Sequence, residues 1–117
     1  MIDSVNFLIG ILTVIFGAFG FLAPRYTLAA LNLETTTTNM GLSEMRASVG
    51  GLFVLFGIYI LIFPSSAGFF HLGIAFSGAA LGRVISLLRD DPPVRKVLVF
   101  GGIEAGMAAW LLLANST

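Results

Sequence analysis

The chain has 117 residues, of which 57% are hydrophobic and 10% are charged, and its formal net charge is zero. Its mean hydropathy of +1.00 excludes an ordinary soluble domain, because a chain of this length cannot surround so much apolar sequence with a polar shell. The charge balance gives no basis for binding nucleic acid, and the lack of cysteine excludes disulfides and thiolate chemistry. With His71 as its one histidine, the chain predicts neither a metal site nor a cofactor.

The first predicted helix covers about residues 5–23, a stretch without any charged side chain. This length is enough to cross the hydrocarbon core of a bilayer. The helix should end at Pro24, which has no N–H to continue the helical hydrogen bonds. The residues before it lack the basic segment of a secretory signal, so we expect a permanent transmembrane helix rather than a cleaved leader.

The connection that follows is the only sizeable loop of the predicted fold. Its first part, residues 25–34, has the composition of a short helix lying at the membrane surface, and the threonines at 35–38 predict irregular structure. We interpret this segment as a connector at the level of the lipid headgroups, and a lid over a site is the alternative.

No charged residue occurs between Ala47 and Gly82, a stretch too long for a single crossing. Pro64 and the two serines after it interrupt this stretch and predict a tight turn. The sequence therefore predicts a second helix over about 43–63 and a third over about 67–88.

The fourth predicted helix, about residues 94–114, follows the polar break at 89–93. Together the four spans predict an all-α fold in which a single integral membrane domain, residues 1–117, forms an antiparallel bundle of four transmembrane helices.

Basic side chains near the helix ends occur only in the first and the last of the three connections. They are Arg25, Arg46, Arg89, Arg95 and Lys96. Since basic residues are retained on the cytoplasmic side, we expect these two connections in the cytoplasm, and Met1, the turn at Pro64 and Thr117 outside. Tyr59 and Trp110, near the outer helix ends, are expected to anchor at the interface.

Small residues recur in all four helices at spacings of three and four. In lipid, where helices have little hydrophobic reason to associate, such residues allow backbones to approach closely. Surplus small faces would also suit a second copy or a membrane-protein partner, so the oligomeric state stays open, and membrane lipid is the other expected partner. The glycines expected to pack helices are Gly10, Gly17, Gly50, Gly57, Gly78, Gly82, Gly102 and Gly106.

Four charged residues cannot be assigned to the connections and are the candidate site residues: Glu44, Arg46, Arg83 and Glu104. Counted from the cytoplasmic helix ends, Arg83 lies about 8 Å deep and Glu104 roughly 13 Å deep. An unpaired carboxylate at that depth is costly, so we expect Arg83 to pair with Glu104 through the two parallel bonds that a guanidinium offers. Glu44 and Arg46 begin on the same side, and one polar cluster would hold all four.

Two interpretations of this cluster remain open. In the first it is structural, with Glu44 complementing a helix start and Arg46 reaching the headgroups. In the second it lines a water-accessible cavity that holds a polar headgroup or a proton.

Three segments of the chain resemble domain of unknown function family 4345, which comprises small bacterial four-helix membrane proteins. They are residues 41–51, 78–83 and 102–104. The resemblance covers nearly the whole chain and implies a four-helix fold in a bacterial inner membrane, but no activity. It also implies that the four charged residues belong together.

We interpret the protein as a non-enzymatic membrane module that holds a ligand or binds a partner. One alternative is a proton-coupled transporter of the small multidrug type. Those transporters keep their key glutamate in the first helix, which has no charge here, and an arginine beside Glu104 would hold its carboxylate ionised.

The other alternative is a small membrane enzyme acting on a lipophilic substrate. Small four-helix enzymes that use glutathione carry a signature that is not present around Arg46. The chain offers Ser77, Ser86 and Glu104 in no recognisable catalytic arrangement, so no catalytic residue is predicted.

Overall fold

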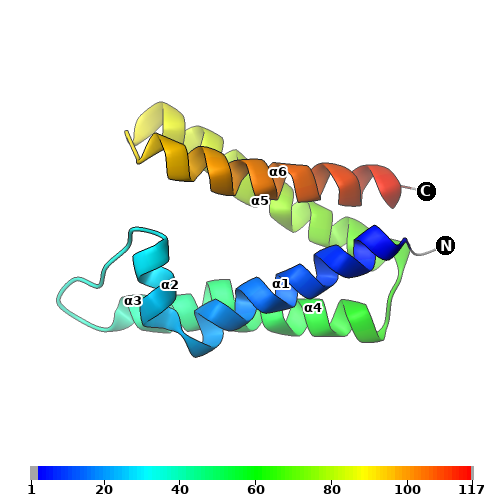
Figure 1. Ribbon diagram of the computed structural model, residues 1–117, viewed down its shortest axis with the longest axis horizontal. Coiled ribbons are helices and arrows are strands. Elements are labelled where there is room, and N and C mark those ends of the chain that lie inside the picture. The colour runs from blue at the N-terminus through cyan, green and yellow to red at the C-terminus, as the bar shows by residue number, and fades with distance from the viewer. Residues whose placement is uncertain (1–2, 117) are drawn as a thin grey trace. The chain divides into compact units, whose positions relative to one another are not determined.

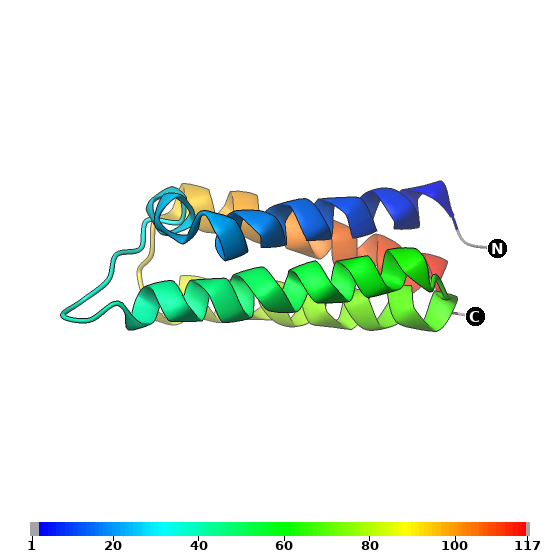
Figure 2. The same ribbon diagram turned by 90° about the horizontal axis from the view of Figure 1, so that it is seen from below.

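The protein is helical, and the computed structural model describes residues 3–116 (Figures 1 and 2). Four helical spans are long and apolar enough to cross a membrane, and each lies within three residues of a predicted one. The all-α class is confirmed, the antiparallel order of the bundle stays a prediction, and the predicted sides of Met1 and Thr117 concern residues outside the described range. The elements are α1 (Ser4–Leu22), α2 (Pro24–Ala30), α3 (Met40–Glu44), the π-helical η1 (Met45–Gly51), α4 (Leu52–Ile62), α5 (Ser66–Arg89) and α6 (Val94–Ala114).

Pro24 ends α1 and starts α2. Ala23 leaves the helical region, with φ −129° and ψ 61°, and Pro24 then takes the first turn of α2, where a missing N–H is tolerated. A helix is present in the segment 25–34 but is shorter than predicted, and its place at the membrane surface stays a prediction.

The C-terminus of α2 forms a Schellman motif. The N–H of Leu33 donates to the carbonyl of Leu28 at 2.8 Å, and the N–H of Asn32 donates to the carbonyl of Ala29 at 3.1 Å. Asn32 supplies the left-handed backbone that this motif needs, with φ 61°. The motif reverses the chain and sets Leu33 beside Leu28.

The second membrane-length helix, Met40–Ile62, is continuous but not uniform. Its central segment η1 is π-helical, with backbone bonds that close one residue later than in an α-helix. Ser48 lies in this wider segment, and its hydroxyl donates to the carbonyl of Glu44 at 2.8 Å.

Residues Phe7–Phe63 form one compact unit, in which α1 lies beside α4 (Figure 1). The backbone of α1 comes into contact with the backbone of both η1 and α4. A Cβ added to Gly17 would stand 2.9 Å from the backbone nitrogen of Val54, and one added to Gly50 would stand 2.5 Å from that of Phe21. Only glycine fits these two contacts.

Gly10 and Gly57 lie on the same contact but meet side chains. A Cβ on Gly10 would stand 2.9 Å from Leu61 Cδ2, and one on Gly57 would stand 2.5 Å from Val14 Cγ2. All four glycines predicted to pack the first two spans are therefore found at their contact.

The second compact unit joins the first six residues to the segment from Pro64 onward and contains α5 and α6. Ser65 caps α5, its hydroxyl accepting a 3.0 Å bond from the N–H of Gly68. Phe69 and Leu111 are fully buried, and a Cβ on Gly73 would stand 2.9 Å from Leu111 Cβ. α5 and α6 therefore meet closely at Gly73.

The four glycines predicted to pack α5 and α6 do not pack them in the described chain. Added Cβ atoms would find nothing within 4 Å at any of the four. On α6 the reason is helical phase, since Glu104 faces α5 and residues two positions away from it point elsewhere. A second chain or a partner on these glycines stays a prediction. They are Gly78, Gly82, Gly102 and Gly106.

Candidate functional site

Arg83 and Glu104 form the ion pair that the sequence predicts. Arg83 Nε donates to Glu104 Oε1 at 3.0 Å, and Arg83 Nη2 donates to Glu104 Oε2 at 3.1 Å. The guanidinium carbon also lies 5.6 Å from the centre of the Phe100 ring, within range of a cation–π contact. The charge on each of the two helices is therefore paired with the opposite charge on the other helix.

Gly101 makes room for this arginine. A Cβ at Gly101 would stand 3.2 Å from both Cβ and Cγ of Arg83, so a larger residue there would press on the arginine stem. The side chains of Arg83 and Glu104 are 35% and 18% exposed, so the pair lies at the edge of the α5–α6 contact. Both carboxylate oxygens are occupied, which leaves the pair closed rather than open to a ligand.

Arg46 forms a hydrogen bond with the C-terminal end of α1. Its Nη1 donates to the carbonyl oxygen of Phe21 at 2.7 Å. That carbonyl is among the last four of α1, which have no helical partner, and the positive charge also suits the negative end of the helix dipole. The side chain therefore acts as a C-terminal cap, a role that neither interpretation of the cluster anticipated.

Glu44 bonds within its own helix. Its Oε2 accepts a 3.1 Å bond from the hydroxyl of Ser48. Glu44 and Arg46 lie in the unit Phe7–Phe63, whereas Arg83 and Glu104 lie in the other, so each pair is described by itself. A single cluster of all four charged residues stays a prediction.

A pocket of about 240 Å³ opens between α2, the connection after it, α3 and η1; we call it the α2–η1 pocket. Its wall is mainly apolar, because the Schellman motif turns leucines toward it and η1 supplies a buried methionine. Its lining residues are Leu28, Leu33, Glu34, Gly41, Glu44, Met45, Ser48 and Val49.

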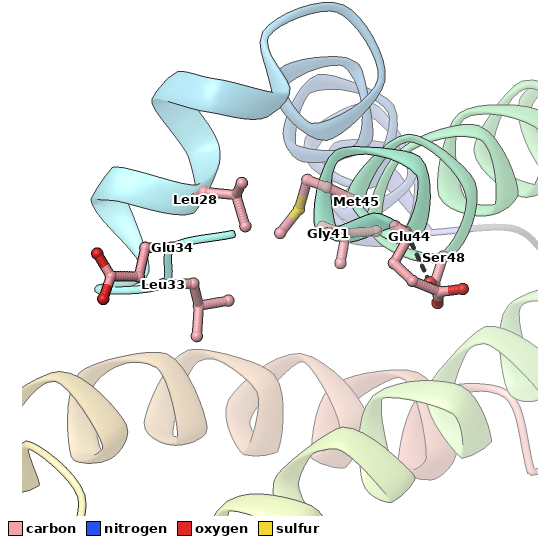
Figure 3. Close-up of a pocket in the computed structure, with 8 residues that line it drawn as sticks. Leu28, Leu33, Glu34, Gly41, Glu44, Met45 and Ser48 are labelled. Atoms are coloured by element: carbon pink, nitrogen blue, oxygen red, sulfur yellow. Dashed lines mark hydrogen bonds between the residues drawn. The ribbon is translucent and has the colours of Figure 1, made fainter. Parts of the chain in front are cut away.

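Figure 3 shows how the side chains are distributed in this pocket. Leu28 and Met45 project toward each other, and the carboxylates of Glu34 and Glu44 lie at opposite edges. The glutamates are exposed, whereas Leu28 and Met45 are buried. The pocket is thus amphipathic, with an apolar interior and an acidic rim. The sequence did not single out Glu34, since a lone acid in a connector carries no recognisable signal.

A buried pair of amide side chains lies in the second compact unit, and the sequence did not predict it. Asn6 Nδ2 donates to Asn115 Oδ1 at 2.8 Å, and Asn115 Nδ2 donates back to Asn6 Oδ1 at 3.1 Å. Trp110, expected as an interfacial anchor, donates its Nε1–H to the same Asn6 oxygen at 3.2 Å. The two amides are only 1% and 6% exposed, so this network joins the start of α1 to the end of α6.

The fold defines a class: an all-α protein with four helices long and apolar enough to cross a membrane. A family model described as "Domain of unknown function (DUF4345)" matches residues 5–115, nearly the whole chain. The protein belongs to this family, as the resemblance in the sequence predicts. Comparison with curated proteins and with solved structures gives no match.

Proposed function

We propose that this protein is a non-enzymatic integral membrane module that holds an amphiphilic ligand in the α2–η1 pocket. The observation that carries the proposal is the amphipathic lining, with Leu28 and Met45 inside and two carboxylates at the rim. Ligand sites commonly combine an apolar wall with a few polar groups that fix orientation.

The place of the pocket in the chain supports an amphiphile. The first membrane-length helix ends at Leu22 and the second begins at Met40, and the pocket is lined by residues between 28 and 49. Residue 49 is roughly 14 Å along the second helix, so the pocket extends from the connection into the first turns of a span. In a bilayer, a pocket of this extent would reach from the level of the headgroups into the acyl chains.

The closed ion pair argues against the transporter and enzyme alternatives. A carboxylate that exchanges protons or binds cargo must be accessible, and both oxygens of Glu104 are bonded to Arg83. In the pocket, the hydroxyl of Ser48 lies beside the carboxylate of Glu44, and the lining residues include no Lys, Arg or His that would complete a nucleophilic site.

The proposal is tested with a neutral probe, dodecanol carrying a photoreactive diazirine, added to the full chain in phosphatidylcholine nanodiscs. After irradiation, peptide mapping should find adducts concentrated on residues 28–49. Leu33→Trp adds an indole to the pocket wall and should reduce these adducts about fivefold.

Met40→Trp is the matched control, because Met40 is an exposed apolar residue of the same region that does not line the pocket. It should leave the labelling unchanged. Adducts spread evenly over all four membrane-length helices, or equal losses in the two variants, would overturn the proposed function.

A further inference from the structure

Neither carboxylate of the α2–η1 pocket is in an ion pair within the unit Phe7–Phe63. Glu34 makes no hydrogen bond or ion pair there, and Glu44 accepts only from the Ser48 hydroxyl. None of the eight lining residues is Lys, Arg or His. The lining of the pocket therefore includes two acidic side chains and no basic one.

Glu104 provides the contrast within the same chain. Its carboxylate is held in two bonds by Arg83, so its charge is already balanced by a fixed partner. The arginine nearest to Glu44 in sequence, Arg46, is engaged with the carbonyl of Phe21 instead. Arg46 is therefore not the partner of Glu44.

We propose that the ligand of the α2–η1 pocket is a lipophilic amine, an alkyl chain that carries one ammonium group. This inference rests on the proposed function and names its ligand class. The alkyl chain of the ligand lies against Leu28 and Met45, which face each other in Figure 3. Its ammonium group stays at the rim with Glu34 or Glu44.

The lining favours a free amine over a phospholipid. An aminophospholipid would bring a phosphate to the same rim, and the lining residues include no basic side chain to receive it. The volume of about 240 Å³ also lies below the usual range for drug-sized ligands, so it suits a head with the first part of one chain.

The test uses three dodecyl probes with the same diazirine and different heads: ammonium, alcohol and carboxylate. In nanodiscs at low salt, pocket adducts should be about five- to tenfold more abundant with the ammonium probe than with the carboxylate probe, and the alcohol should be intermediate. The preference should shrink in high salt, because exposed charges are screened.

The variant Glu34→Gln with Glu44→Gln should remove the preference for the ammonium probe and leave labelling by the alcohol unchanged. Asp90→Asn with Asp91→Asn is the matched control. It removes two exposed acids from another connection, changes the net charge equally and should keep the preference. Loss of the preference in this control would show that membrane surface charge, not the pocket, selects the probe, and would overturn the inference.

Two further results would also overturn it. If the three probes label the pocket equally, the pocket holds alkyl chains without selecting charge, and the proposed function survives alone. If phosphatidylethanolamine added to the bilayer displaces the ammonium probe, the occupant is a phospholipid. Absence of pocket adducts with every probe would instead reject the proposed function itself.

Discussion

The two compact units of this protein hold their helices together by different means. In Phe7–Phe63, α1 approaches both η1 and α4 until added Cβ atoms at Gly17 and Gly50 would strike backbone. In the other unit, α5 and α6 are joined by the Arg83–Glu104 pair in addition to apolar contacts. Glycine spacing is similar in both, so spacing alone does not reveal which helices touch.

The largest effect should come from filling the glycine contact. Gly50→Ala places a Cβ 2.5 Å from the backbone nitrogen of Phe21 and should lower the free energy of unfolding by about 3 kcal/mol, because the helices must separate. Gly82→Ala, in open space, should leave it unchanged or raise it by about 0.5–1 kcal/mol, since alanine favours the helix. Unfolding in mixed micelles followed by circular dichroism measures both, and equal losses would contradict the difference between the units.

The ion pair should give the next largest effect. Glu104→Gln and Arg83→Gln should each lower the free energy of unfolding by about 1.5–3 kcal/mol, because each leaves a charge without its bidentate partner. The double variant should lose less than the sum by about 1 kcal/mol or more. Arg89→Gln, an exposed arginine on the same helix, serves as the control. Additive losses would show that the pair does not couple α5 to α6.

The amide network should give a smaller effect. Asn6→Ala leaves buried groups of Asn115 and Trp110 without their acceptor and should cost about 1–2 kcal/mol. Trp110→Phe keeps an aromatic side chain but loses the Nε1–H bond and should cost about 0.5–1 kcal/mol. Asn39→Ala, at an exposed site without a side-chain cap bond, should be neutral. Thermal unfolding monitored by circular dichroism ranks the stability of the three variants. A loss of stability at Asn39 equal to that at Asn6 would contradict the role of the network.

Hydropathy and proline placement were sufficient to predict the helical spans. A transmembrane helix needs a charge-free run of a certain length, and Pro24 and Pro64 each lie two residues after the end of a helix. The ion pair was predictable for a similar reason, because two opposite charges at comparable depth have few ways to avoid hydrocarbon.

The other features depend on contacts that leave no local signal. Asn6 and Asn115 are 109 positions apart, and nothing near either residue indicates the other. Arg46 caps α1 only because α1 lies beside the helix that carries it. The α2–η1 pocket requires the left-handed backbone of Asn32, which a single asparagine only weakly predicts.

The π-helical segment has a consequence for how this chain can vary. A turn that takes in one additional residue rotates everything before it by roughly 100° relative to everything after it. Met45–Gly51 therefore sets the angular offset between the pocket-facing Glu44 and the contact residue Gly57. Deleting one residue within it would let the segment close as a regular α-helix with Glu44 and Gly57 on their present faces, so a change of one residue in length is best tolerated here.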